Sequence, residues 1–155
     1  MEGIAAAEAE VPNYGLVVTG HSLGGAAAVF GAAEMRKAGK RLALFTYGQP
    51  RAGNEAFSKI VTEQAGGNFR VTHTSDAVPK LPPMKGPANS LYGAYSHISP
   101  EYWIRKGFGN DGNIAVLQGF NNNKGNAGTG QLKFNILAHI GYFQRNMYMC
   151  VLPIP

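Results

Sequence analysis

The chain has 155 residues, of which 45% are hydrophobic and 15% are charged, and its formal net charge is +5. This length suits one folded domain over residues 1–155, and the composition excludes a disordered chain. No apolar run approaches the ~18–20 residues that are needed to cross a bilayer. The basic residues are scattered, without a zinc-finger or aromatic RNA-binding motif, so we expect no nucleic-acid partner.

The first segments predict a helix, a strand and a second helix. The opening MEGIAAAEAE lacks the basic and apolar regions of a signal peptide and suits the end of a helix over residues 2–10. Residues 12–15 are typical of a turn, and LVVT (16–19) predicts a strand buried on both faces. A helical pattern then extends from Leu23 to about Ala38, before a C-capping Gly39.

The rest of the chain continues this alternation. Further strands are predicted at 42–47, 69–74, 101–105 and 114–118, with a helix at 54–65. The alternation indicates an α/β fold, with a mainly parallel sheet and flanking helices. Residues 75–99 predict a long loop, and loops of this length are usually functional. We expect GFNNNKGNAGTG (119–130) to be a flexible surface segment with no chemistry of its own.

The segment Gly20–Gly25, GHSLGG, lies between the first predicted strand and the helix that follows. In that place G-x-S-x-G is typical of the nucleophile elbow of α/β-hydrolases. The tight turn strains the serine, Ser22, so we expect glycine to be required two residues before and two after it. The helix N-terminus favours an oxyanion, and we predict the N–H of Leu23 as one oxyanion donor. A passive serine is the alternative; a phosphate-binding loop would need a lysine that is missing.

A serine hydroxyl is a weak nucleophile and needs a histidine base that a carboxylate orients. In this fold the chain order is serine, acid, histidine. Asp76 directly follows the predicted strand 69–74, at the carboxyl edge of the sheet where sites in such folds form. Asp111 lies in an Asn-Asp-Gly sequence, whose ordinary role is turn formation. We therefore predict Asp76 as the acid.

Two histidines follow Asp76. His97 lies in the long loop, where a packing role is an ordinary one, and His139 begins the apolar segment AHIGYF. Chain order favours His139 and leaves His97 as the alternative. His21 and His73 precede the acid; we expect His21 to have a structural role in the elbow and His73 to be a strand residue.

Four blocks of the sequence resemble the class 3 lipases, the filamentous-fungal family that also includes feruloyl esterases. They are VVTGHSLGGA (17–26), FTYGQPRAGNEAF (45–57), VTHTSDAVPKLPP (71–83) and the pair YSHISPEYWI (95–104) with AHIGYF (138–143). The resemblance implies an α/β-hydrolase fold and a catalytic triad of Ser22, Asp76 and His139, with no cofactor and no metal ion.

The same resemblance implies a serine carboxylic-ester hydrolase that works through an acyl-enzyme. The expected substrate is an acylglycerol, in particular a triacylglycerol, at a lipid–water interface, and a feruloyl ester is the alternative. The secreted lipases of the family imply an extracellular location.

The chain departs from the family pattern at its start. Family members carry the other oxyanion-hole residue, the lid and several strands in an N-terminal half that precedes the elbow, so we expect a truncated domain. In the secreted members a cysteine near the C-terminus pairs with one near the N-terminus, whereas Cys150 is the single cysteine here. A weakly active or inactive remnant is therefore a second hypothesis, and a binding module for anionic partners, based only on net charge, is a third.

Overall fold

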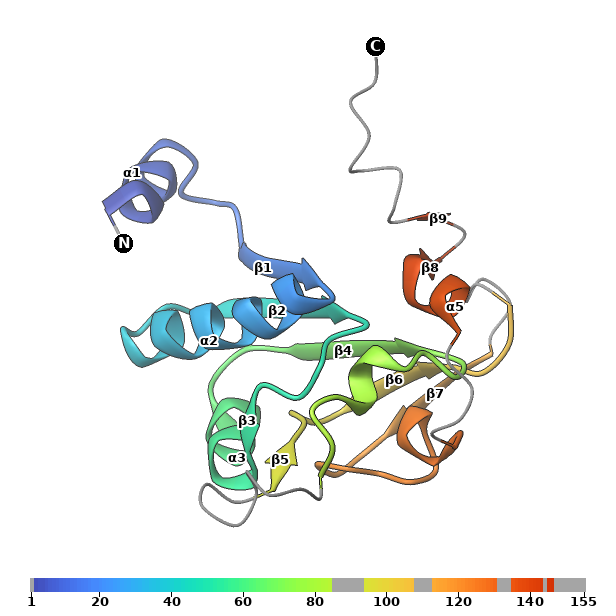
Figure 1. Cartoon of the computed structure of the whole chain (residues 1–155). Helices are drawn as coiled ribbons and strands as arrows, with labels where there is room; N and C mark the ends of the chain where they lie inside the picture. The colour runs from blue at the N-terminus through green and yellow to red at the C-terminus, as the bar shows by residue number, and fades with distance from the viewer. Residues whose placement is uncertain (1, 85–93, 108–112, 131–134, 144, 147–155) are drawn as a thin grey trace.

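The computed structural model describes residues 2–84, 94–107, 113–130, 135–143 and 145–146 (Figure 1). Its helices are α1 (Glu2–Glu10), α2 (Leu23–Lys37), α3 (Glu55–Glu63) and α5 (Ile136–Ile140), with short 3-10 helices η1 (Val78–Lys80) and η2 (Asn126–Gly128). Its strands are β1 (Leu16–His21), β2 (Leu42–Tyr47), β3 (Gly53–Asn54), β4 (Asn68–His73), β5 (Tyr95–Ser96), β6 (Glu101–Ile104), β7 (Ile114–Leu117), β8 (Gly141–Tyr142) and β9 (Arg145–Asn146). None of the described helices is both long and apolar enough to span a membrane.

Five strands form the main sheet in the order β1-β2-β4-β6-β7. The pairs from β1 to β6 are parallel, and β7 runs antiparallel to β6. Parallel neighbours need a crossover connection, and the helices α2 and α3 supply two of them. The predicted α/β class with a mainly parallel sheet is confirmed. Strand β2 has the predicted bounds, and β1 continues two residues beyond the predicted end, to His21.

In the described part of the chain, the core consists of two apolar clusters on opposite faces of the sheet. In the first, α2 places small side chains against Leu42 and Leu44 of β2; the helix contributes Ala28, Val29, Ala32 and Ala33, at helical spacing. In the second, Val71 and Ile104 pack with Tyr142, and Tyr47 of β2 lies against them. Because side chains alternate along a strand, Tyr47 faces away from Leu42 and Leu44. The sheet therefore separates α2 from the segment that contains Tyr142.

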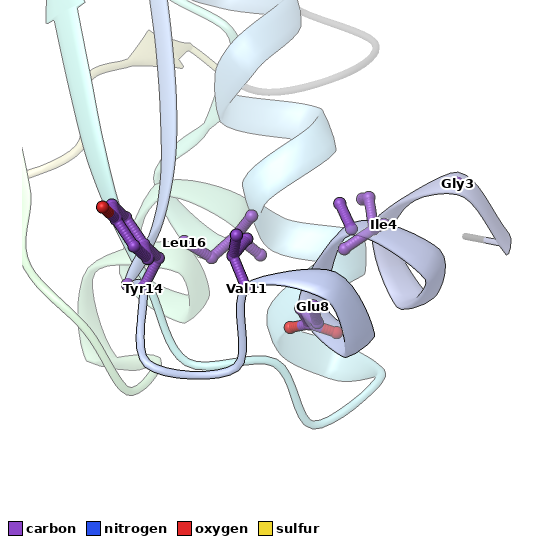
Figure 2. A pocket seen from close by; sticks show the side chains of 8 residues that line it. Gly3, Ile4, Glu8, Val11, Tyr14 and Leu16 are labelled. Atoms are coloured by element: carbon purple, nitrogen blue, oxygen red, sulfur yellow. The ribbon is translucent and has the colours of Figure 1, made fainter.

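Strand β1 is an edge strand, and the prediction that it is buried on both faces was wrong. Val17 is 56% exposed and Thr19 is also exposed. Among the described residues, no strand pairs with the outer edge of β1. Periodicity identifies a strand but does not show which neighbours cover it. Helix α1 has no buried residue and stands away from the sheet (Figure 1), and a shallow pocket lined by Ile4, Val11 and Leu16 lies between α1 and β1 (Figure 2).

The predicted loop 75–99 contains two short elements. Helix η1 comes directly after the turn with Asp76, and β5 pairs antiparallel with β3. These elements attach both ends of the loop to the body of the fold.

Candidate active site

Three neighbouring parallel strands end at the same edge of the sheet. Ser22 follows β1, Gly48 follows β2, and Asp76 lies three residues after β4. The N–H of Ser22 donates to the carbonyl of Tyr47 at 2.9 Å, which ties the end of β1 to that of β2. Figure 1 shows α5 beside this edge. Carboxyl ends of parallel strands are where sites form in open α/β sheets.

Ser22 sits in a strained turn between β1 and α2. Its φ is 56° and its ψ is −129°, in a region that non-glycine residues seldom adopt. A Cβ at Gly20 would lie 2.3 Å from the carbonyl oxygen of Gly24, so residue 20 must be glycine. The strained serine and the glycine two residues before it agree with the predicted elbow.

The second position at which glycine is sterically required is Gly25, one residue after the predicted Gly24. Outside its chain neighbours and the backbone of its own helix, a Cβ at Gly24 would meet no described atom within 4 Å, whereas one at Gly25 would lie 3.0 Å from Cβ of Gln49. The turn brings the first turn of α2 against the loop after β2, and the close approach falls at Gly25. The prediction that Gly24 is sterically required was therefore wrong.

Helix α5 carries His139 to Ser22. Asn135 caps this short helix by accepting a hydrogen bond from the N–H of Ala138 at 3.1 Å. His139 is buried, and its Nε2 lies 2.9 Å from Oγ of Ser22 across a sequence separation of 117 residues. The structure thus pairs the serine with His139.

Asp76 lies on the other side of the same imidazole. Its Oδ2 is 2.9 Å and its Oδ1 is 3.1 Å from Nδ1 of His139. An ionised carboxylate only accepts, so Nδ1–H of His139 donates and the unprotonated Nε2 accepts from the hydroxyl of Ser22. The N–H of Val78 also donates to Oδ1 of Asp76, at 2.9 Å. Ser22, His139 and Asp76 therefore form one continuous line of hydrogen bonds.

Tyr142 is a residue of this site that sequence reasoning missed. Its hydroxyl donates to Oδ2 of Asp76 at 2.8 Å, and the side chain is fully buried. Burial, and then the negative charge of Asp76, raises the pKa of Tyr142 well above its ordinary value. The available signal was a hydroxyl-bearing aromatic in the apolar segment after His139, because a buried tyrosine hydroxyl usually has a partner.

Because Gly48 has no side chain, the space beside it is open to the side chains of Asp76 and His139, which meet there. Its φ is +57°, and a Cβ there would lie 2.9 Å from both Oδ2 of Asp76 and Nδ1 of His139. Any larger residue would displace at least one of the two side chains.

Two other histidines hold the segment that contains His139. Nε2–H of His21 donates to the carbonyl of His139 at 2.7 Å, and the two rings lie 4.6 Å apart. Burial lowers the pKa of His21, and its hydrogen bond to the carbonyl of His139 opposes this effect. In β4, Nδ1 of His73 lies 3.0 Å from the carbonyl of Ala138. The contact of His21 agrees with a structural role, and His73 is a strand residue as predicted.

His97, the alternative base, occupies a separate buried position. Its Nε2–H donates to the carbonyl of Pro79 at 2.6 Å, and its Nδ1 has no hydrogen-bond partner in the part of the chain that the structure describes. Burial, and then the charges of Arg70 and Arg51, lowers the pKa of His97 well below its ordinary value. Asp111, the alternative acid, and Cys150 lie outside the described residues.

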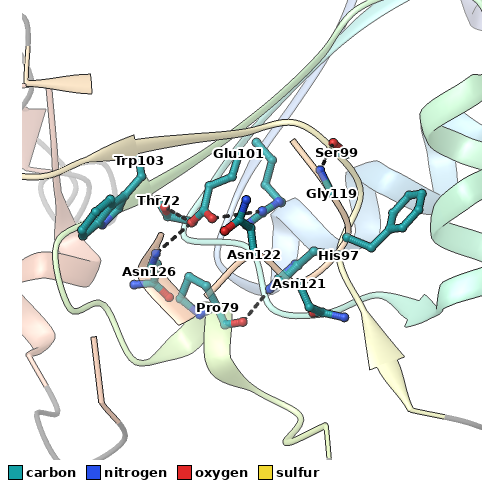
Figure 3. A network of polar contacts seen from close by, with 12 residues as sticks. Thr72, Pro79, His97, Ser99, Glu101, Trp103, Gly119, Asn121, Asn122 and Asn126 are labelled. Atoms are coloured by element: carbon teal, nitrogen blue, oxygen red, sulfur yellow. Dashed lines mark hydrogen bonds and ion pairs between the residues drawn. The ribbon is translucent and has the colours of Figure 1, made fainter. Parts of the chain in front are cut away.

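The stretch 119–130 is not wholly the surface segment without chemistry that the sequence predicts, because it contains a buried residue. Asn126 is only 2% exposed, and its backbone N–H donates to Oε1 of the buried Glu101 at 3.2 Å. Its side-chain amide donates to the carbonyl of Asp76 at 2.8 Å. Figure 3 shows Asn126 beside Glu101 and Thr72, with His97 and Pro79 near them. Composition does not separate amides that face solvent from amides that satisfy buried carbonyls.

The start of α2 also offers a backbone donor of a kind that oxyanions use. Leu23 is the first residue of α2, and the first N–H groups of a helix have no acceptor within it. Over the described ranges, no three histidine, cysteine, aspartate or glutamate side chains gather in a way that could hold a metal ion.

Comparison with known proteins identifies the family of this chain. A model of the lipase (class 3) family matches residues 1–86. The chain is 44% identical over 156 residues to secreted mono- and diacylglycerol lipase 1 of Fusarium solani. This match covers 98% of this chain and 44% of that protein. It is 46% identical over 140 residues to secreted mono- and diacylglycerol lipase A of Penicillium cyclopium. This second match covers 87% of this chain and 43% of that protein.

A solved structure has the same fold. The crystal structure of a mono- and diacylglycerol lipase from Aspergillus oryzae matches with a TM-score of 0.79 and 37% identity, over 92% of this chain and 52% of that chain. The fold is thus that of an α/β-hydrolase. The chain belongs to the class 3 lipase family, and it spans about half the length of the relatives that it matches.

Proposed function

We propose that this chain carries the catalytic centre of a carboxylic-ester hydrolase, with Ser22 as nucleophile, His139 as general base and Asp76 as the acid that orients it. One observation carries the proposal: Oγ of Ser22 is 2.9 Å from Nε2 of His139, and Nδ1 of the same ring is 2.9 Å from Oδ2 of Asp76. This is the geometry in which an imidazole removes a proton from a serine hydroxyl.

The proposed reaction has two stages. Oγ of Ser22 attacks the ester carbonyl as Nε2 of His139 takes its proton, and the N–H of Leu23 donates to the oxyanion that forms. His139 then gives the proton to the departing alcohol, which leaves an acyl-enzyme on Ser22. A water molecule releases the acid by the same steps, and the hydroxyl of Ser22 is restored. Asp76 keeps the proton of the ring on Nδ1 throughout, so that Nε2 faces the serine.

The proposed substrates are acylglycerols at a lipid–water interface. The sequence alone favours triacylglycerols, whereas the names of the Fusarium solani and Penicillium cyclopium proteins support mono- and diacylglycerols. We therefore propose partial glycerides as the preferred substrates, with triacylglycerols and feruloyl esters as competitors in the test. The same names support secretion, and we propose an extracellular location.

A fluorophosphonate probe tests the site directly. The folded chain should be labelled at Ser22, and Ser22→Ala should lose both labelling and ~10⁴–10⁶ of the turnover, as a triad member does. His139→Ala should lose the labelling as well, whereas His97→Ala should keep it. Hydrolysis of monoolein, diolein, triolein and a feruloyl ester then ranks the substrates. A folded wild-type chain that neither reacts with the probe nor hydrolyses any of these esters contradicts the proposal.

A second candidate is a chain that keeps the triad but turns over slowly. The observation behind it is the outer side of β1, where Val17 is 56% exposed and no strand pairs among the described residues. The Fusarium solani lipase, of which the match covers 44%, supplies the material for a test. Joining the preceding half of that lipase to this chain should raise the turnover by ~10²–10³ if the added half supplies one oxyanion donor. Equal turnover of the two proteins would reject this candidate.

A further inference from the structure

We propose that Asn126 is a positioning residue for the catalytic acid: its side-chain amide clamps the turn Thr74–Asp76 and so fixes the carboxylate of Asp76 against His139. The inference rests on the proposed function of the triad. It concerns a residue 50 positions further along the chain than the acid.

The turn that carries Asp76 is strained. Thr74 has a φ of 38°, which is unfavourable for a β-branched residue. The surroundings hold it there: its N–H donates to the carbonyl of Ile104 at 2.7 Å, and Nε1–H of Trp103 donates to its carbonyl at 3.0 Å. Strained backbone persists only where neighbouring groups determine it, so the donors to this turn decide where Asp76 lies.

Asn126 brackets the turn with one functional group. Nδ2 donates to the carbonyl of Thr74 at 3.2 Å and to that of Asp76 at 2.8 Å. An amide nitrogen has two hydrogens, and both are used here. Because Asn126 is buried, its removal would leave the carbonyl of Asp76 without this donor in a place that water does not freely reach.

The clamp is itself held in place. The N–H of Asn126 donates to Oε1 of Glu101, which also accepts from Oγ1 of Thr72 at 2.5 Å (Figure 3). The hydroxyl of Thr129 donates to the carbonyl of Asn126 at 2.8 Å. These contacts fix Asn126 relative to β4 and β6. Its side-chain amide, through its two hydrogen bonds, therefore holds the turn Thr74–Asp76 in a fixed position relative to the same strands.

The carboxylate of Asp76 depends on this backbone. Oδ1 accepts from the N–H of Val78, two residues further on, so a rotated turn would move the carboxylate and its donor together. A misplacement of about 1 Å by a residue away from the chemistry can lower a rate about 100-fold. Asn126→Ala should thus lower kcat by about 10- to 100-fold and leave KM unchanged, since Asn126 is buried and its side-chain amide donates to backbone carbonyls.

The rate test uses a matched control and a double mutant. Asn122→Ala removes an amide from the same stretch; this residue's Nδ2 donates only to the carbonyl of Gln118 among its described contacts, and its rate should stay within about twofold of wild type. If Asn126 acts through Asp76, adding Asn126→Ala to the Asp76→Asn variant should lower kcat by less than about twofold, because the effects of coupled residues are not additive. An equal loss in both backgrounds, or a single mutant within twofold of wild type, overturns the proposal.

Amide hydrogen exchange gives a readout that does not need activity. The N–H of Asp76 donates to the carbonyl of His73 and that of Val78 to Oδ1 of Asp76; both should exchange about tenfold faster in Asn126→Ala, but not in Asn122→Ala. If Asn126→Ala does not fold, Asn126→Ser, which keeps one small donor, replaces it in every measurement. Unchanged exchange overturns the clamp even in an active enzyme. The two proposals can fail separately. If the probe does not label the wild-type chain but exchange in Asn126→Ala is faster as expected, the proposed function is rejected and the clamp is retained.

Discussion

The hydroxyl of Tyr142 donates a 2.8 Å hydrogen bond to Oδ2 of Asp76, the same oxygen that lies 2.9 Å from Nδ1 of His139. One carboxylate oxygen thus accepts from two residues that are three positions apart in the chain. Tyr142 lies in the apolar cluster with Val71 and Ile104, so packing of its ring fixes the direction of its hydroxyl. The contact links the core on this face of the sheet to the orientation of the acid.

Replacing Tyr142 by phenylalanine should lower kcat about tenfold without raising KM. The change removes a hydrogen bond to a charged group, which contributes about 1.5–3 kcal/mol, and part of this should appear as a less well oriented Asp76. Tyr102→Phe is the matched control, because its ring packs against the same cluster. Steady-state kinetics and melting curves of both variants check this; an equal loss of kcat in the two would show that the hydrogen bond to Asp76 is not the cause.

Asp76→Asn should lower turnover by roughly 10⁴-fold. The amide can turn its N–H₂ towards the ring, which would favour the tautomer with its proton on Nε2, facing Ser22. Asp111→Asn should change the rate little. Parallel measurements on a short-chain ester compare the two, and a larger loss in the Asp111 variant would mean that the wrong acid has been chosen.

Gly48→Ala should impair the site more than the fold. Its Cβ would lie 2.9 Å from both Oδ2 of Asp76 and Nδ1 of His139, so we expect a loss of about 100-fold in kcat from their displacement. Gly31→Ala is the control: its Cβ would meet only Cε of Met35, at 3.9 Å, inside helix α2, and should stabilise the protein by up to about 1 kcal/mol. Retention of full activity by Gly48→Ala would show that the pair can adjust.

His97 should make the protein less stable as the pH falls. Burial and the charges of Arg70 and Arg51 hold its pKa in the folded state well below the unfolded value of about 6.5. The unfolded chain therefore binds a proton that the folded chain does not, and the free energy of unfolding drops by up to about 1.4 kcal/mol per pH unit below pH 6.5, until the folded pKa is reached.

The variant His97→Gln should remove this dependence, because glutamine does not titrate and its amide can still donate to the carbonyl of Pro79. Urea unfolding at pH 7, 6 and 5 should give a flatter profile for the variant than for wild type. His21, whose pKa burial also lowers, contributes in the same direction and remains in both proteins. If the free energy of unfolding depends on pH equally in the two proteins, His97 is not the source of the dependence.

Local sequence signals were enough for the elements that position Ser22 and Asp76. The elbow has a fixed spacing between a strand and a helix, and the bounds of β2 follow from a short apolar run between turn residues. The exposure of β1, and the roles in which Tyr142 and Asn126 contact Asp76, could not be predicted in this way. Tyr142 and Asn126 lie 66 and 50 residues from Asp76 in the chain, and partners at such separations leave no periodic pattern in the sequence.

The long separation between Ser22 and His139 has a consequence for folding. His139 reaches the serine only when the segment after Asn135 docks on the ends of β1 and β4, through the carbonyls that His21 and His73 contact. Local formation of β1 and α2 therefore leaves Ser22 unreactive, because a hydroxyl without its base is a weak nucleophile. In a refolding time course, reaction with a fluorophosphonate would report the arrival of the C-terminal segment, after circular dichroism has already recorded the helices.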